Sequence, residues 1–463
     1  MKGMSVHMKK PLFSKIFSIM VTMTFILGLT CQTSYAKPEQ SGMVTLERDS
    51  KGNFVLKRDG AEYFIKGAAT MLNGNGADPG FAQLAAAGGN SVRTWGAADD
   101  PVMFDAAQQK GLTVCAGLWL NRPYEMDYND PVQVQQQHDA LISYVRANKD
   151  HPALLLWGVG NEYEGDGSNP NVWKAVDQIA ASIKQIDPKH PTMTVIAGFS
   201  PAKVESIKTY CPNIDIIGFN SYAGLAVFPD YFEQLNLDRP YIITEYGPRG
   251  QWECPTVRLG STDVPLEMTS TEKAEFILEN YNTSIVNPSN QTVTKFSLGS
   301  YAYFWGVEPR FSNTHTWLET HLFSSFERLN TVDVLTKAWT GAYPRKRCPS
   351  IEPLVSNASG MEVAPGGKYL AAVNAKDQGN PHLSISWEVR PEITAVGQPL
   401  APIEGSIISQ CGQYVVFKAP ETEGIYRLFV YVKDGKGNAA TANFPFYSKP
   451  GLPVPSDPVI PDK

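Results

Sequence analysis

Cysteine and histidine, the usual ligands of zinc, are scarce in this sequence. Its 463 residues include only six cysteines and seven histidines, and no Cys-x-x-Cys pair occurs. The histidines are too scattered to complete a zinc site. We therefore expect no metal and no other cofactor. Five cysteines follow the N-terminal segment, so at least one has no partner within the chain, and the pairings Cys348 with Cys411 and Cys211 with Cys254 both stay open.

Long hydrophobic runs and excess positive charge are also lacking. After Leu29 no apolar run approaches the roughly 20 residues that a membrane-spanning helix needs. The formal net charge is −6, whereas surfaces that bind nucleic acid carry Lys and Arg in excess. We therefore expect no membrane domain and no nucleic-acid partner. The oligomeric state stays open.

The N-terminal segment has the features of an export signal. Four lysines precede an apolar run over residues 16–29, and Ser34 and Ala36 supply the small residues that signal peptidase needs. This order of charge, apolar run and small residues is typical of a secretory signal peptide. We expect residues 1–36 to be removed and the mature protein to be secreted or periplasmic.

Short apolar runs alternate with amphipathic segments between Tyr63 and Trp339. This alternation predicts repeated βα units and a parallel sheet. Eight such units match a (β/α)8 barrel better than a doubly wound sheet. The predicted strands are residues 63–67, 91–95, 113–118, 154–159, 194–197, 214–219, 241–244 and 301–305. The predicted helices include residues 131–148, 171–186 and 271–287.

The segments on either side of the barrel have other patterns. A hairpin at residues 43–57 is expected to cap the bottom of the barrel. From residue 354 onward, alternation of apolar and polar residues predicts a small antiparallel sandwich of Ig-like size. We therefore predict a barrel domain over residues 37–347, a β-sandwich over 348–448, and an extended or disordered proline-rich tail over 449–463.

Two glutamates follow predicted strands of this barrel. The fourth strand leads to Asn161-Glu162, and the seventh strand leads to Glu245. The C-terminal ends of the strands form the active face of such barrels. Paired carboxylates on one face suit the cleavage of a glycosidic bond, because one protonates the leaving oxygen and the other attacks the anomeric carbon. Two surface-loop glutamates are the alternative.

The surroundings of both glutamates resemble known motifs. Residues 151–162 look like the strand-four signature of glycoside hydrolase family 2 catalytic domains, and residues 243–247 look like their strand-seven nucleophile motif. The same layout belongs to clan A generally, including family 5 and the β-1,3-glucanosyltransferase family 72. Residues 64–67 and 90–95 are also similar to these families. The resemblance covers the barrel and implies that Glu162 is the acid/base and Glu245 the nucleophile.

The resemblance also implies roles for polar neighbours of the two glutamates. Asn161 resembles the asparagine that hydrogen-bonds the sugar 2-hydroxyl. Arg93, at the end of the second strand, is expected beside Glu245, where its charge would favour the ionised carboxylate. Tyr222 is expected to donate a hydrogen bond to Glu245. A structural ion pair is the alternative for Arg93.

Aromatic residues near other strand ends are candidates for the sugar-binding surface. Trp305, after the eighth strand, is predicted to form the apolar platform under the bound sugar, and Trp119 and Asn121, after the third strand, are predicted to line the cleft. Packing at the top of the barrel is the alternative for the aromatics. His315 and His321 are expected on a solvated or substrate-lining loop rather than at a metal.

These observations predict a retaining β-glycoside hydrolase that acts by double displacement on β-linked poly- or oligosaccharides. A β-glucan transglycosylase that uses the same site is an alternative, because it shares the first half-reaction. A non-catalytic carbohydrate-binding envelope protein is the other, since sandwich modules often bind glycan or space domains. Full family 2 enzymes carry two sandwich domains before the barrel, which this chain lacks, so glucan, mannan, galactoside and glucuronide substrates all stay open.

Overall fold

The computed structural model describes most of the chain after the N-terminal segment. The described residues are 42–71, 77–96, 101–286, 295–307, 314–323, 325–379, 382–392 and 400–460. The predicted signal peptide lies outside them. In these described parts of the chain, no helix is both long and apolar enough to cross a membrane.

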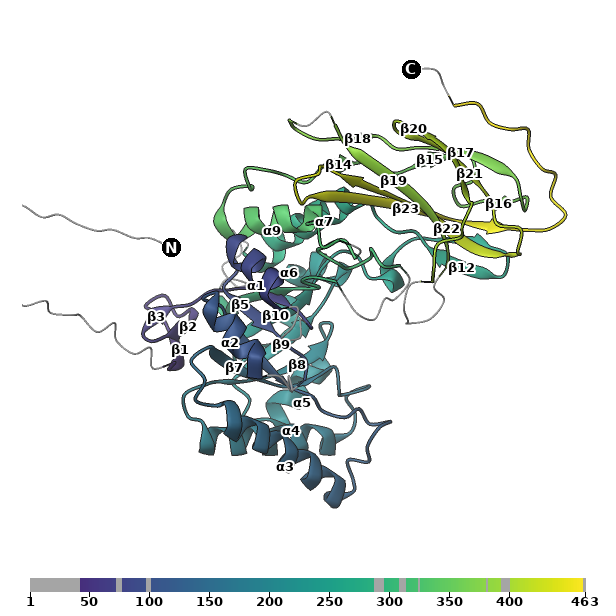
Figure 1. The fold of residues 1–463 in the computed structure, drawn as a ribbon. Coiled ribbons are helices and arrows are strands. Elements are labelled where there is room, and N and C mark those ends of the chain that lie inside the picture. The colour runs from purple at the N-terminus through teal and green to yellow at the C-terminus, as the bar shows by residue number, and fades with distance from the viewer. Residues whose placement is uncertain are drawn as a thin grey trace, which may run out of the picture. The chain divides into compact units, whose positions relative to one another are not determined.

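Eight parallel strands close into a barrel, as predicted (Figure 1). Their side chains are almost all buried on both faces, since the interior fills with side chains and helices cover the outside. In chain order they are β4 (Ile65–Ala69), β5 (Ser91–Arg93), β6 (Thr113–Leu118), β7 (Leu154–Asn161), β8 (Thr192–Ala197), β9 (Ile216–Asn220), β10 (Tyr241–Tyr246) and β13 (Ser297–Ala302).

The helices around the barrel begin where the sequence places helix starts. Asp130, Asn169 and Ser200 each accept a backbone N–H of the first turn, and a proline follows each of them. The main helices are α1 (Ala77–Ala86), α2 (Pro101–Gln109), α3 (Pro131–Asn148), α4 (Pro170–Ile186), α5 (Pro201–Tyr210), α7 (Ser270–Asn280) and α9 (Asn330–Thr340). Shorter turns are η1 (Ala223–Val227), α6 (Phe228–Tyr231), η2 (Phe232–Leu235), η3 (Gln251–Glu253) and η4 (Tyr281–Ile285).

An N-terminal hairpin closes the end of the barrel where the strands begin. It consists of β1 (Val44–Arg48), β2 (Phe54–Arg58) and the short β3 (Ala61–Glu62). Val44 and Leu56 pack in one buried cluster with Ile65, Leu156 and Ile242 of the barrel strands. This packing confirms that the hairpin caps the bottom of the barrel.

The eighth barrel strand differs from its prediction. β13 covers Ser297–Ala302 rather than residues 301–305. The strand approaches β4 so closely that a Cβ on Gly299 would lie 2.2 Å from the Ile65 carbonyl oxygen. The close approach requires a small residue at Gly299, so this strand lacks a continuous apolar run. The sequence pattern instead predicted the strand at the more apolar residues 301–305.

Two four-stranded sheets form the predicted sandwich (Figure 1). Trp387, Phe417, Val430 and Phe444 pack between them. One sheet has the order β15 (Val355–Ser356), β17 (Lys368–Ala372), β21 (Tyr414–Lys418) and β20 (Ile407–Cys411). The other has the order β16 (Glu362–Val363), β23 (Ala439–Ser448), β22 (Gly424–Lys433) and β19 (Ser384–Pro391). Two-stranded pairs are β14 (Ser350–Ile351) with β18 (Ala375–Lys376), and β11 (Thr256–Leu259) with β12 (Thr262–Pro265).

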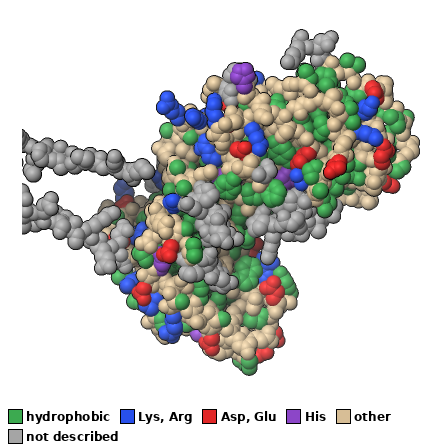
Figure 2. Space-filling model, viewed as in Figure 1, with side chains coloured by type: hydrophobic (Ala, Val, Ile, Leu, Met, Phe, Trp, Pro, Cys, Tyr) green, Lys and Arg blue, Asp and Glu red, His purple; other side chains and the backbone are tan. Residues whose placement is uncertain are grey.

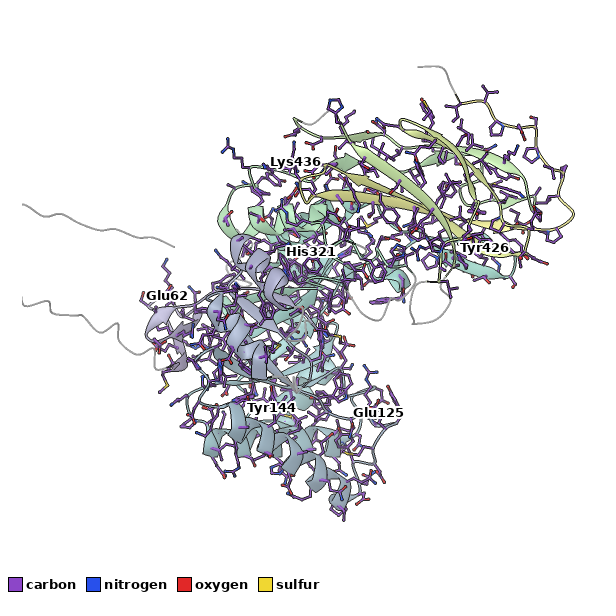
Figure 3. The ribbon with its side chains drawn as sticks, viewed as in Figure 1. Glu62, Glu125, Tyr144, His321, Tyr426 and Lys436 are labelled. Atoms are coloured by element: carbon purple, nitrogen blue, oxygen red, sulfur yellow. The ribbon has the colours of Figure 1, made fainter. Side chains whose placement is uncertain are left out.

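The expectation that His315 and His321 lie on a solvated or substrate-lining loop was wrong. Both side chains are buried. His315 Nε2 lies 2.5 Å from the hydroxyl of Tyr431 in β22, and His321, labelled in Figure 3, contacts Gln83 of α1. Burial lowers the pKa of His315 to about 4 and that of His321 to about 3. Both rings are therefore neutral packing groups at neutral pH.

The five cysteines of the described chain are all free thiols, so neither open pairing forms. Cys115 is fully buried in β6, as expected for a small apolar residue. On the face drawn in Figure 2, acidic and basic side chains are interspersed rather than gathered by sign.

Candidate active site

The two predicted glutamates lie at the same end of the barrel. Glu162 directly follows β7, and Glu245 is the second-last residue of β10. Because all eight strands are parallel, these ends meet at one rim. Glu162 has a φ of 49°, a left-handed conformation that non-glycine residues rarely adopt and that is enriched at functional sites.

Three donors converge on the carboxylate of Glu245. Its Oε1 accepts from Arg93 Nη1 at 3.0 Å and from Trp95 Nε1 at 2.5 Å, and its Oε2 accepts from the Tyr222 hydroxyl at 2.9 Å. The Glu245 residue is only 5% exposed. A buried carboxylate with donors on both oxygens is held in one orientation, as a nucleophile requires. The structure thus brings Arg93 and Tyr222 to the positions that the sequence predicted.

Glu162 is connected to Glu245 through a short hydrogen-bond network. Asn220 Nδ2 donates to Glu162 Oε1 at 2.9 Å and to Asn161 Oδ1 at 3.1 Å. Arg93 Nη2 donates to the same Asn161 oxygen at 2.6 Å, and Arg93 Nη1 reaches Glu245. Two intervening side chains and the arginine therefore join the two carboxyl groups across the barrel rim.

Burial, followed by the negative charge of Glu245, raises the pKa of Glu162 above the usual range for a glutamate. The hydrogen bond from Asn220 opposes this rise. A carboxyl group that keeps its proton to higher pH can act as a general acid, while a nearby carboxylate held by cationic and neutral donors acts as the nucleophile. Glu162 has a raised pKa, whereas Glu245 accepts hydrogen bonds from the cationic Arg93 and from the neutral donors Trp95 and Tyr222.

Glu162 lines an open cleft of about 570 Å³. That volume lies in the range of small-molecule binding sites. The cleft is bounded by the loops after β8, β9 and β10. Its lining residues are Glu162, Ala197, Gly198, Phe199, Asn220, Ser221, Tyr222, Gly224, Val227, Tyr231, Trp252 and Glu253.

Trp305 is not at the site. It is fully buried, and its indole nitrogen donates to the Gly80 carbonyl at 2.8 Å, among helices outside the barrel. Because β13 ends at Ala302, the residue that reaches the site is Tyr303 instead. The Tyr303 ring makes edge contacts with Trp95 and with Tyr222, at centroid distances of 5.6 and 5.9 Å.

Trp119 and Asn121 lie in the loop after β6. Trp119 is 38% exposed and packs under the Arg122 guanidinium at 5.6 Å. Asn121 Nδ2 points to the sulfur of Met126 at 3.9 Å. Among the described hydrogen bonds, neither residue bonds to Glu162 or Glu245, and neither belongs to the cleft that Glu162 lines. The negative charge of Glu162 acts on Arg122, which places this loop near the rim.

Sequence reasoning missed Trp95, Asn220 and Tyr303. Trp95 ends the second predicted strand, two residues after Arg93, and Asn220 ends β9 two residues before Tyr222. Both residues lie within two positions of a predicted site residue at the end of a barrel strand, and this closeness in the sequence was the available signal.

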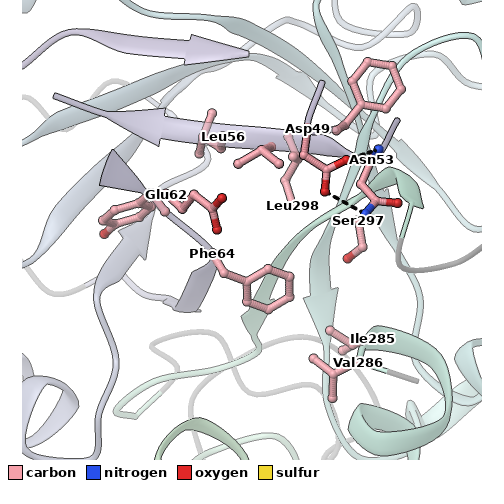
Figure 4. A pocket seen from close by; sticks show the side chains of 12 residues that line it. Asp49, Asn53, Leu56, Glu62, Phe64, Ile285, Val286, Ser297 and Leu298 are labelled. Atoms are coloured by element: carbon pink, nitrogen blue, oxygen red, sulfur yellow. Dashed lines mark hydrogen bonds between the residues drawn. The ribbon is translucent and has the colours of Figure 1, made fainter. Parts of the chain in front are cut away.

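No cluster of three or more His, Cys, Asp or Glu residues that could hold a metal occurs among the residues that the structure describes. A second cavity, of about 320 Å³, lies at the opposite end of the barrel beside the hairpin (Figure 4). Leu56, Phe64 and Leu298 line it together with the acidic residues Glu62 and Asp49. Neither Glu162 nor Glu245, nor any residue that hydrogen-bonds to their carboxyl groups, is among the residues that line this cavity.

Residues 80–301, just under half of the chain, match the family described as "Glycosyl hydrolases family 2, TIM barrel domain". The match covers both glutamates. It bears out the resemblance to family 2, whereas similarity to families 5 and 72 stays a prediction.

Individual relatives are distant and longer. The chain is 24% identical over 161 residues to the β-galactosidase of Vibrio vulnificus strain CMCP6, covering 34% of this chain and 15% of that protein. It is 23% identical over 203 residues to human β-glucuronidase, covering 41% and 29%. A crystal structure of Bacteroides uniformis β-glucuronidase superimposes with a TM-score of 0.48 and 15% identity, covering 88% of this chain and 48% of that one. The chain therefore spans less than half the length of these proteins.

Proposed function

We propose that the protein is a retaining β-glycoside hydrolase, with Glu245 as nucleophile and Glu162 as acid/base. The observation that carries the proposal is the pair of carboxyl groups at one barrel rim, the buried Glu245 and the half-buried Glu162, joined by Arg93, Asn161 and Asn220. Retention uses two carboxyl groups on either side of one glycosidic bond, and their unequal environments fit the two roles. The match of residues 80–301 to a glycosyl hydrolase family supports the same reading.

In the first step, an oxygen of Glu245 bonds to the anomeric carbon while the bond to the leaving oxygen breaks. Glu162 gives its proton to that oxygen. Arg93, Trp95 and Tyr222 hold Glu245 in line for the attack. The Asn161 side chain, fixed by Arg93 and Asn220, is placed to contact the sugar ring beside the reacting carbon.

In the second step, Glu162 accepts a proton from a water molecule. The water oxygen bonds to the anomeric carbon, and the ester bond to Glu245 breaks. Two inversions leave the product with the anomeric configuration of the substrate. A sugar hydroxyl in place of water would give transglycosylation from the same intermediate, and product analysis at high acceptor concentration separates the two outcomes.

The substrate class is a β-linked poly- or oligosaccharide. β-Galactosides and β-glucuronides are the first to test, because the relatives carry those activities in their names. We also propose export of the protein, on the charge and apolar pattern of residues 1–36.

The test is hydrolysis of a panel of aryl β-glycosides and β-glucans by the wild type and by Glu245→Gln. The substitution removes the nucleophile, so kcat should fall at least about a thousandfold while the melting temperature stays close to that of the wild type. Glu125→Gln, at an exposed glutamate in the loop after β6 (Figure 3), is the matched control and should keep full activity. Full activity of Glu245→Gln, or glycan binding without any hydrolysis by the wild type, would refute the proposal.

A further inference from the structure

We propose that Trp252, Tyr231 and Val227 form the binding subsite for the leaving group, and that its ligand is a neutral pyranosyl residue. This inference rests on the proposed function, because it starts from Glu162 as the group that protonates the leaving oxygen. The leaving group must then lie on the Glu162 side of the anomeric carbon. The cleft is lined by Glu162 and by residues of the loops after β8, β9 and β10, and Glu245 is not among its lining residues.

Exposed apolar side chains of the loops after β9 and β10 line this cleft. Trp252 is 64% exposed, Val227 48% and Tyr231 45%. Exposed apolar surface beside a catalytic group is unusual unless a ligand covers it. A pyranose ring presents an apolar C–H face that packs on an aromatic ring, whereas a small alcohol has no such face.

Hydrogen bonds fix the loops that carry these side chains. Glu253 Oε2 accepts the backbone N–H groups of Ala223 and Gly250, both at 2.9 Å, and so ties the Trp252 turn to the η1 turn. Trp317 Nε1 donates to the Arg249 carbonyl on the same loop. A surface fixed in advance binds with a smaller loss of conformational freedom.

The charge of the cleft determines the kind of sugar. Among the described residues that line it, the acidic ones are Glu162 and Glu253, and none is Lys or Arg. An anionic leaving sugar, such as a uronic acid, would lack a cationic partner in the cleft and would meet the acidic side chain of Glu253. The subsite therefore favours a neutral pyranosyl unit of a β-linked chain.

The position of Trp252 also makes a structural role testable. Its ring meets Tyr222 edge-on, at a centroid distance of 5.6 Å and an angle of 89°. A substitution that only loosened the packing of Tyr222 would disturb its hydrogen bond to Glu245 and would therefore lower kcat/KM for every substrate. Loss of a leaving-group subsite would slow only substrates that fill it.

The experiment compares a β-glycosyl fluoride with a β-linked disaccharide of the same reacting sugar. Fluoride fills no sugar subsite. The reacting sugar is the one that the wild type accepts among β-glucosyl, β-galactosyl and β-glucuronyl fluorides. Trp252→Ala should lose about tenfold more kcat/KM on the disaccharide than on the fluoride, in the range of a buried contact residue, and Trp252→Phe should restore most of the difference. Tyr343→Ala, an exposed aromatic after α9, is the matched control.

Equal losses on both substrates, or no loss on the disaccharide, would overturn the subsite. A wild-type preference for a disaccharide with an anionic leaving sugar would overturn its neutral character. Failure of the proposed function is recognised separately, because the wild type itself would then hydrolyse neither kind of substrate.

Discussion

At the scale of single residues, the two carboxyl groups of the site differ in the number of hydrogen-bond donors that each receives. Glu245 receives three donors, and Glu162 is bonded by Asn220 alone among the described hydrogen bonds. This asymmetry distinguishes a carboxyl group held in one orientation, that of Glu245, from one with a single side-chain donor, that of Glu162. Two predictions concern these contacts.

Tyr222→Phe should lower kcat/KM about ten- to a hundredfold, because one donor to Glu245, the proposed nucleophile, is lost in a buried site. The melting temperature should change little, since the ring still packs against Tyr303. Tyr426→Phe, which removes a hydroxyl bonded to the Thr422 carbonyl in the sandwich, is the matched control. Equal rates for Tyr222→Phe and wild type would show that this contact does not serve the nucleophile.

Glu162→Gln should raise the melting temperature at pH 8 and change it little near pH 4. Burial and the charge of Glu245 raise the pKa of Glu162 in the folded state, so folding favours the protonated form. The stability that this provides is present below the unfolded pKa and is lost as pH rises through the folded pKa. A neutral glutamine avoids that loss. Differential scanning calorimetry against pH tests the prediction, and a variant destabilised at pH 8 would contradict it.

At the scale of elements, the sequence predicted those with strong local signals. The bounds of β6 and α3 agree with the prediction to the residue, because a continuous buried run and a capped, proline-started helix are local features. β13 was misplaced because its course is set by close approach to β4 at Gly299, a tertiary feature. Because of this error, the prediction assigned Trp305 to the site and omitted Tyr303.

The cap of α3 can be tested directly. Asp130→Ala should lower the free energy of unfolding by about 1 kcal/mol, since the carboxylate accepts the Val132 N–H at 2.8 Å. Asp139→Ala, at an exposed acid within α3, should cost less. Urea unfolding measures both, and equal losses would argue against the assigned helix start.

At the scale of the whole molecule, a buried polar network joins the barrel to the sandwich. Glu267, just before α7, is paired with Lys273 and accepts from Asn443 of β23 at 2.6 Å. Arg427 of β22 donates to the Pro265 carbonyl at 2.6 Å. Such a network appears only when distant segments fold together, so the strand pattern of residues 354–448 predicted the sandwich but not its contacts with the barrel.

Lys273→Met should destabilise the protein by about 3 kcal/mol or more, because it leaves the Glu267 carboxylate buried without its cation. Lys208→Met is the control, since its partner Glu205 is exposed. Chemical unfolding of both variants gives the comparison. A loss of similar size for both would mean that the network contributes little.

The most direct test of the central claim is identification of the residue that bonds to the sugar. The wild type would be incubated with the 2-deoxy-2-fluoro-β-glycosyl fluoride of its accepted sugar, digested, and analysed by mass spectrometry. The account predicts one added fluoroglycosyl group, on Glu245, and none in Glu245→Gln. Label on another residue, or turnover with an inverted anomeric product, would contradict it.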